Sequence, residues 1–298
     1  MSASAQGHLA MLLFSALVAG SFPLGAAAAN DISPLALNAV RFVLAAAIIG
    51  TFVAWRGGVP AVARDSLWRY GALGGVFAVY FVLMFEGLKT AAPVSAAAVF
   101  TLTPVLAAGF GWVLLRQVTT PRIALALTLG ACGALWVIFR ADVSALLAFE
   151  IGRGEWIYLV GCAAHALYTP MVRLLNRGES ALVFTFGTLV AASAILLVVG
   201  APALVATDWT TLPRTVWIAI GYTAVFASAA TFTLLQFASL RLPSAKVMAY
   251  TYLVPAWVTV WGIALGDAPP PVEMLIGVGL TILALVALLR DGNAQKSL

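Results

Sequence analysis

Two pairs of polar side chains recur at helical spacing inside long apolar stretches of this sequence. Lys246 and Tyr250 are four residues apart, and His165 and Tyr168 are three apart, so each pair would share one face of a helix. An ammonium, an imidazole and two phenols can all exchange hydrogen bonds with a small ligand. These residues indicate a binding site, and we expect no catalytic residues and no metal site.

Aromatic stripes accompany these pairs. Phe77, Tyr80 and Met84 would share a helix face, as would Tyr222 and Phe226. Together these groups predict an aromatic-walled chamber that suits a planar apolar metabolite with a polar end. The predicted substrate-binding residues are Ser21, Phe22, Tyr80, Met84, His165, Tyr168, Phe226, Lys246 and Tyr250.

Structural interpretations stay open for several of these residues. Lys246 follows Pro243 by about 5 Å of helix and could reach the cytoplasmic interface instead of a cavity. A neutral His165 could be hydrogen-bonded between helices. Tyr250 and Tyr252 would point about 200° apart, so they cannot both face one cavity.

Two further charges fall inside apolar segments toward their outer side. Arg41 and Glu86 would either form a charge pair between helices or lie separately at the interface. We expect a structural role for both.

The composition is that of a membrane protein. Of 298 residues, 63% are hydrophobic and 9% are charged, whereas soluble chains carry about a quarter charged residues. The net charge of +5 therefore need not indicate nucleic acid, and we expect no nucleic-acid partner. Cys132 and Cys162 lie in apolar runs without disulfide or zinc-site spacing, and we expect two buried thiols.

Ten segments are long and apolar enough to cross a bilayer, which needs roughly 20 residues. This predicts an all-α integral membrane protein with almost no soluble part. The expected spans are residues 8–29, 34–55, 67–88, 92–115, 121–139, 154–175, 180–200, 214–238, 243–265 and 270–289.

Basic residues distribute unevenly over the connections. With the N-terminus inside, 11 of the 16 Lys and Arg residues fall on the inner side, so the positive-inside rule predicts both termini in the cytoplasm. The inner set is Arg56, Arg64, Arg69, Arg116, Arg122, Arg173, Arg177, Arg241, Lys246, Arg290 and Lys296, and the outer set is Arg41, Lys89, Arg140, Arg153 and Arg214.

Prolines recur in the two halves. A shift of 147 residues aligns Pro23 with Pro170, and a shift of 151 aligns Pro104 with Pro255. Five helices per half is an odd number, so residues 1–144 and 145–298 would form two repeats that insert with opposite orientation. Inverted repeats are typical of secondary transporters, and we expect these four prolines to act as hinges.

The stretches AAPVSAAAVFTLTPVLAAGFGWVLL (91–115) and LPSAKVMAYTYLVPAWVTVWGIALGD (242–267) resemble the drug/metabolite transporter superfamily, EamA type. The likeness covers nearly the whole chain. Family members commonly end this helix with Gly-Glu, whereas this chain has Arg116-Gln117 and Gly266-Asp267. The aromatic content of helices six, eight and nine resembles the branch that exports aromatic amino acids. The resemblance implies a central cavity lined by helices one, three, four, six, eight and nine.

The predicted function is secondary transport by alternating access, exporting small organic metabolites, with amino acids and especially aromatic ones favoured. The expected location is the inner (plasma) membrane, with the substrate and lipid bilayer as partners and no cofactor; a monomer is compatible with this. A nucleotide-sugar, drug or other metabolite carrier is the alternative within transport. A membrane-embedded lipid-modifying enzyme and a scaffold are the alternatives outside it.

Overall fold

The computed structural model describes residues 3–139, 141–148 and 151–294, and their regular structure is entirely helical. The helices are α1 (Ala3–Ala19), α2 (Ser21–Ala28), α3 (Pro34–Trp55), α4 (Ala61–Arg64), α5 (Trp68–Gly87), α6 (Pro93–Phe100), α7 (Thr103–Leu115), α8 (Pro121–Ile138), α9 (Val143–Ala148), α10 (Arg153–Leu175), α11 (Ala181–Val199), α12 (Ala201–Ala206), α13 (Arg214–Ala224), the π-helix η1 (Val225–Ala230), α14 (Thr231–Ser239), α15 (Ser244–Met248), the 3₁₀-helix η2 (Ala249–Leu253), α16 (Val254–Ala264) and α17 (Val272–Ala294).

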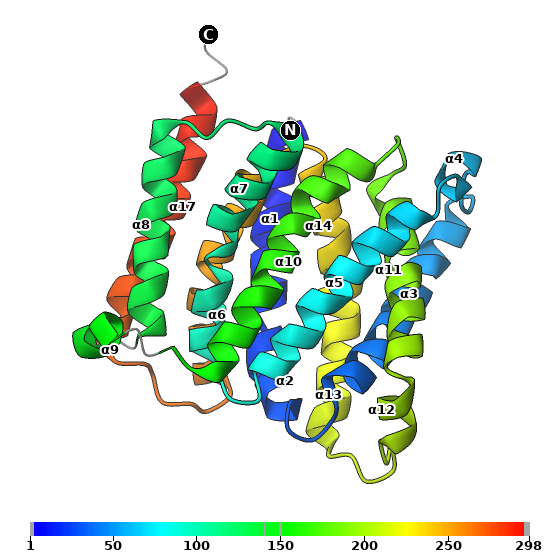
Figure 1. Cartoon of the computed structure of the whole chain (residues 1–298), viewed down its shortest axis with the longest axis horizontal. Helices are drawn as coiled ribbons and strands as arrows, with labels where there is room; N and C mark the ends of the chain where they lie inside the picture. Colours follow the sequence, from blue (N-terminus) through cyan, green and yellow to red (C-terminus); the bar gives the residue numbers. More distant parts are fainter. Residues whose placement is uncertain (1–2, 140, 149–150, 295–298) are drawn as a thin grey trace.

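Nine candidate membrane spans are found in the described residues by length and composition: Ala3–Ala28, Pro34–Trp55, Trp68–Gly87, Pro93–Leu115, Pro121–Ile138, Ala181–Val199, Arg214–Ser239, Ser244–Ala264 and Val272–Leu289. They coincide with nine of the ten expected segments, and the first begins earlier than expected, at Ala3. The remaining segment is α10, whose His165, Tyr168 and terminal charges make it less apolar. It nevertheless runs the depth of the bundle beside α5 (Figure 1). Ten spans stay a prediction.

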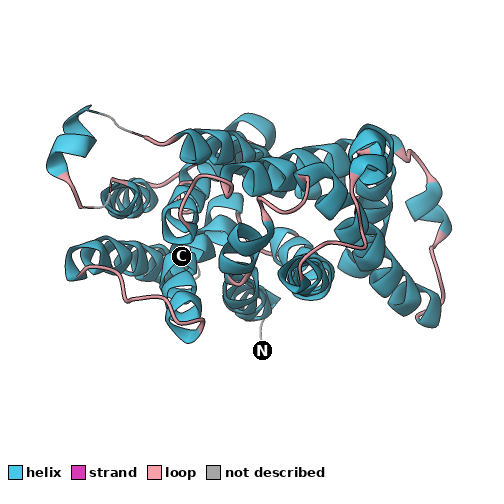
Figure 2. Cartoon of the chain, turned by 90° about the horizontal axis from the view of Figure 1, so that it is seen from below, coloured by secondary structure: helices cyan, strands magenta, loops and turns pink. Residues whose placement is uncertain are grey.

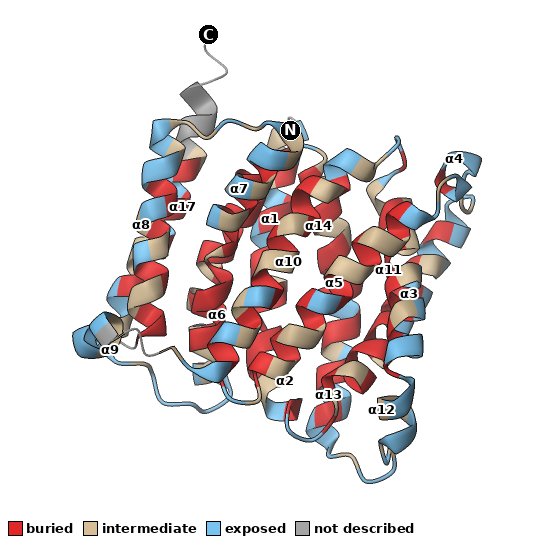
Figure 3. Cartoon of the chain, viewed as in Figure 1, coloured by how far each residue is buried: buried red, intermediate tan, exposed pale blue. Residues whose placement is uncertain are grey.

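The described ends of the chain lie at one end of the bundle. The start of α1 and the close of α17 are together there with α4, whereas α9 and α12 lie at the opposite end (Figure 1). Seen end-on, the long helices pack side by side (Figure 2), and their buried faces meet in the interior (Figure 3). Arg140 and Lys296 lie outside the described residues, as does the Arg290 side chain.

Three of the four predicted hinge prolines lie just after an interruption in a span. A turn at Gly20 separates α1 from α2 ahead of Pro23, Thr101 and Leu102 separate α6 from α7 ahead of Pro104, and η2 precedes Pro255. A proline removes a backbone donor and crowds the preceding turn, which explains these positions. At Pro170, by contrast, α10 continues through the proline without interruption, and a hinge at this residue stays a prediction.

Close helix packing depends on paired glycines. A Cβ on Gly87 would lie 2.7 Å from the Gly154 carbonyl oxygen, so α5 and α10 meet backbone to backbone at this point. A Cβ on Gly133 would lie 2.6 Å from the Gly277 carbonyl oxygen, which gives α8 and α17 the same closeness. The expectation of two buried thiols is half right, because Cys162 is buried on α10 whereas Cys132 is exposed on α8.

Candidate functional site

His165 lies at the centre of the bundle inside a set of aromatic rings. Its imidazole lies 4.3 Å from the Tyr80 ring, 5.2 Å from Phe100, 5.4 Å from Phe77 and 6.4 Å from Phe14, centroid to centroid. We call these five residues the ring cage. Its members come from α1, α5, α6 and α10, and all are at most 2% exposed. Three of these spacings fall within the 4.5–7 Å of favourable aromatic pairs and the Tyr80 spacing lies just below it, so the rings fill the space between these helices.

The interior of the described chain holds polar atoms without a hydrogen-bond partner. Both ring nitrogens of His165 are buried, and neither has a hydrogen bond within the described chain. The same holds for the hydroxyls of Thr169, one turn further on α10, and of Ser21, at the turn between α1 and α2. Each such group costs about 1–3 kcal/mol when it stays unsatisfied. A stretch of buried donors and acceptors that the protein does not use is what a polar ligand requires.

Hydrogen bonds fix the rings on either side of His165. The Tyr80 and Tyr158 hydroxyls lie 3.1 Å apart, which joins α5 to α10. The Tyr168 ring stacks on Phe77 at 4.0 Å, and its hydroxyl oxygen accepts from the Gln236 amide nitrogen at 2.6 Å. These bonds hold the aromatic side chains in defined rotamers, so the site is preorganised on helices.

The structure brings four of the predicted residues into this network. Tyr80 and His165 belong to the ring cage, Tyr168 stacks on it, and Phe22 contacts Phe100 at 5.9 Å. Ser21 precedes Phe22 and is fully buried. Met84 is also fully buried, in the core one turn beyond Tyr80.

Three predicted residues lie elsewhere. Phe226 is 43% exposed and packs on Tyr222, so its stripe faces outward. The Tyr250 hydroxyl lies 3.1 Å from Nδ1 of His8 near the start of α1. Lys246 is 7% exposed, which places it largely inside the protein on α15, with no side-chain bond shown in the described chain.

Tyr250 and Tyr252 diverge as predicted. Tyr250 points to α1, whereas the Tyr252 hydroxyl donates to the Leu127 carbonyl of α8 at 3.4 Å. The two phenols of η2 therefore contact two different helices, α1 and α8.

Arg41 and Glu86 do not form the charge pair that was one expectation. Glu86 Oε2 accepts from Lys89 Nζ at 2.7 Å on the surface. Arg41 is fully buried and reaches across to η1, where its Nη2 donates to the Ala227 carbonyl and its Nε to the Ser228 hydroxyl, both at 2.7 Å.

A buried ion pair closes the bundle at the end where the termini lie. Arg69 Nη2 and Glu179 Oε1 are 2.7 Å apart with both side chains at most 1% exposed. Tyr70 donates a further bond to the same oxygen at 3.2 Å. Burial alone would raise the pKa of the Glu179 carboxyl, but the Arg69 guanidinium and the Arg177 backbone N–H hold this pKa below its usual value. The carboxylate is therefore charged at neutral pH.

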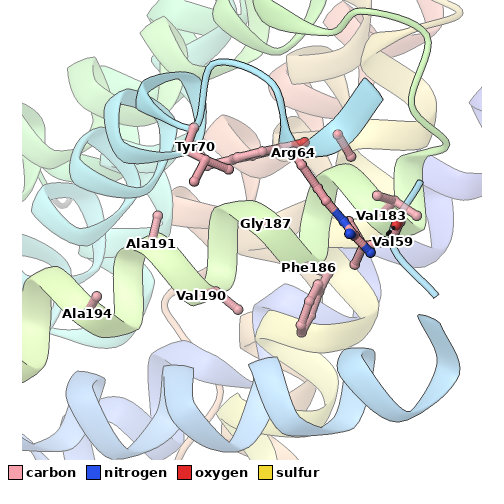
Figure 4. A pocket seen from close by; sticks show the side chains of 11 residues that line it. Val59, Arg64, Tyr70, Val183, Phe186, Gly187, Val190, Ala191 and Ala194 are labelled. Atoms are coloured by element: carbon pink, nitrogen blue, oxygen red, sulfur yellow. Dashed lines mark hydrogen bonds between the residues drawn. The ribbon is translucent and has the colours of Figure 1, made fainter. Parts of the chain in front are cut away.

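Two cavities open near this ion pair. One of about 290 Å³ lies between α11 and the segment that runs from α4 to the start of α5, and Arg64, Tyr70 and Phe186 are among the residues that line it (Figure 4). The other, about 690 Å³, lies between α3, α11 and α14 and is lined by both Glu179 and Arg241. The larger cavity therefore has charged side chains in its wall.

The sequence model of the EamA-like transporter family matches residues 5–139 and again residues 152–290. This chain belongs to the EamA-like transporter family. The two matches divide this EamA-like transporter into halves, and they make it a multi-pass membrane protein of the drug/metabolite transporter superfamily.

Two relatives extend over nearly the whole of the EamA-like transporter. An uncharacterized transporter, YyaM, from Bacillus subtilis (strain 168) is 27% identical over 282 residues, which are 94% of this chain and 92% of that protein. An uncharacterized transporter from Archaeoglobus fulgidus is 24% identical over 283 residues, 92% of this chain and 94% of that protein. A solved structure described as "Crystal structure of protein" has a TM-score of 0.71 at 21% identity, with 96% of each chain covered. This last likeness concerns the fold.

Several site residues of the EamA-like transporter escaped the sequence prediction. Phe14, Phe100 and Gln236 stand alone in apolar sequence, and no helical spacing links them to His165. Thr169 could have been found, because it follows His165 by four residues and therefore shares its helix face.

Proposed function

We propose that this EamA-like transporter exports small organic metabolites, most favourably aromatic amino acids, across the inner (plasma) membrane. The observation that carries the proposal is the ring cage with the unpartnered His165 nitrogens at its centre. An aromatic substrate would replace ring–ring contacts of the protein with its own, and its polar end would use the unpartnered donors and acceptors.

The mechanism we propose is alternating access by two halves, residues 1–144 and 145–298, inserted in opposite orientation. The separate family matches to each half support the repeat. The interruptions of the fourth and ninth expected spans meet where the Thr103 and Thr251 hydroxyls lie 3.2 Å apart. Short non-α segments at such a meeting point can absorb the backbone rotations of a rocking motion.

The substrate would enter through the cavity between α3, α11 and α14. Its 690 Å³ is within the range of small-molecule sites, and it opens at the end where we propose the cytoplasm lies. Opening the Arg69–Glu179 pair would widen this approach, because the pair ties α5 to the connection before α11.

The test is flux in proteoliposomes that contain the purified protein. Vesicles loaded with unlabelled phenylalanine should take up labelled phenylalanine by counterflow, and tryptophan and tyrosine should compete. Protein-free vesicles are the control for leakage, and leucine and lysine report selectivity for the ring. If no aromatic amino acid shows protein-dependent flux, the cargo assignment is wrong.

A further inference from the structure

The bundle contains a buried cation that no acid neutralises. The guanidinium of Arg41 is 0% exposed and makes three hydrogen bonds, all to neutral groups: the Ala227 carbonyl, the Ser228 hydroxyl and the Asn38 side-chain oxygen. No carboxylate of the described chain lies within 4.0 Å of it. Burying a charge without a counter-ion is unfavourable in protein and in lipid, so such residues are functional candidates.

Arg69 provides an internal comparison. It is buried to the same degree as Arg41, and it has Glu179 at 2.7 Å as its counter-ion. The chain therefore neutralises the buried guanidinium of Arg69 but not that of Arg41. The absence of a counter-ion is therefore specific to Arg41 and is not shared by the other buried guanidinium.

Arg41 also lies beside the ring cage. Its guanidinium carbon is 3.8 Å from the centroid of the Phe81 ring, and that ring contacts Tyr80 at 4.4 Å and Phe77 at 5.2 Å. Tyr80 and Phe77 both contact His165. Two rings in succession, Phe81 and then Tyr80 or Phe77, thus separate the cation from the unpartnered imidazole. This arrangement fits a molecule with an aromatic body and an anionic end.

The helix that Arg41 contacts departs from α-helical geometry at the point of contact. Ala227 and Ser228 belong to the π-helix η1, which interrupts the α-helical geometry between α13 and α14. Single π-turns within α-helices occur frequently at functional sites. A guanidinium has five N–H donors, and the three bonds of Arg41 use one on each nitrogen, so two donors stay available for a carboxylate.

We infer that Arg41 is the anion-binding group of the substrate site, and that the transported compounds are aromatic carboxylates, including amino acids with a free carboxylate. The inference rests on the proposed function and narrows it. The carboxylate binds the two available N–H groups of Arg41 while the aromatic ring packs against Tyr80 and Phe77. The substrate then supplies the counter-ion that the chain lacks.

The wild-type protein gives the first test, since it requires no mutation. Inhibition of labelled phenylalanine counterflow is compared for 3-phenylpropionate, phenylalaninamide and phenethylamine. Loss of a charge-assisted bond corresponds to about tenfold or more in affinity, so the amide and the amine should compete at least about tenfold more weakly than phenylalanine. The 3-phenylpropionate anion should compete measurably better than either. Equal inhibition by phenylalanine and phenylalaninamide overturns the inference while leaving transport intact.

Variants then assign the discrimination to the residue. Arg41→Gln should reduce the preference for phenylalanine over phenylalaninamide to near unity, Arg41→Lys should keep part of it, and Arg214→Gln, at an exposed position, should keep all of it. A full preference in folded Arg41→Gln overturns the assignment. If Arg41→Gln does not fold, the Arg41→Lys preference and the wild-type series decide the question. Absence of flux for every compound in the wild type refutes the proposed function instead.

Discussion

A structural role and a ligand-binding role for His165 predict different hydrogen bonding of its ring nitrogens. A histidine kept for packing would be expected to have at least one ring nitrogen hydrogen-bonded, because a buried unsatisfied group costs about 1–3 kcal/mol. Both nitrogens instead have no partner in the described chain, and the imidazole is stacked on the Phe77 ring. The position therefore carries a stability cost that a ligand would recover.

His165→Phe tests this cost directly. Phenylalanine keeps the ring contacts with Phe77 and Tyr80 and removes both polar nitrogens. We expect the thermal unfolding temperature in detergent to rise, in line with a gain of about 1 kcal/mol, while phenylalanine flux falls at least about tenfold. Thr169→Val, which also removes an unpartnered group, is the matched control for the gain in stability. A destabilised His165→Phe protein with unchanged flux would contradict the binding role.

At this scale the sequence predicted residues that share a helix and missed those that meet across helices. His165 and Tyr168 follow from spacing alone. Arg41 reaches a partner 187 residues away, and no local pattern contains that contact. The same contact explains the outward position of Phe226, because small residues occupy the inward face of η1 where Arg41 enters.

At the scale of elements, proline predicts the helices that are interrupted, but it does not predict that α10 is continuous. Pro104 and Pro255 follow a short non-α segment, whereas Pro170 is accommodated inside α10. Helices can retain a proline when neighbouring helices support the freed backbone groups, and α10 is packed along α5. Sequence shows the proline but not the neighbours that support it.

The packing of α8 against α17 leads to a prediction about stability. Gly133→Ala would place a Cβ 2.6 Å from the Gly277 carbonyl oxygen, and backbone cannot move aside as a flexible side chain would. We expect a loss of about 1–3 kcal/mol, seen as a lower unfolding temperature in detergent. Gly279→Ala on α17 is the control, because its Cβ meets nothing within 4 Å, and it should be neutral or slightly stabilising. Equal behaviour of the two variants would show that α8 and α17 are not in close contact.

For the whole molecule, the sidedness of the connections is a prediction that the fold makes testable. Apolar segment lengths and odd helix numbers per half place alternate connections at opposite ends, and the structure arranges them so, with α4 at one end and α12 at the other (Figure 1). Which end faces the cytoplasm depends on the distribution of Lys and Arg over the connections and not on helix packing.

Cysteine labelling decides the orientation. In a Cys132→Ser background, Arg177→Cys reports the connection between α10 and α11, and Asp208→Cys reports the connection between α12 and α13, both at exposed positions. The positive-inside rule predicts that a membrane-impermeant maleimide labels Asp208→Cys in intact cells and labels Arg177→Cys only after permeabilisation. The background protein should stay unlabelled in intact cells, since Cys162 is buried. Labelling of Arg177→Cys from outside would mean that the bundle has the opposite orientation in the membrane. The cavity between α3, α11 and α14 would then open to the exterior and act in uptake.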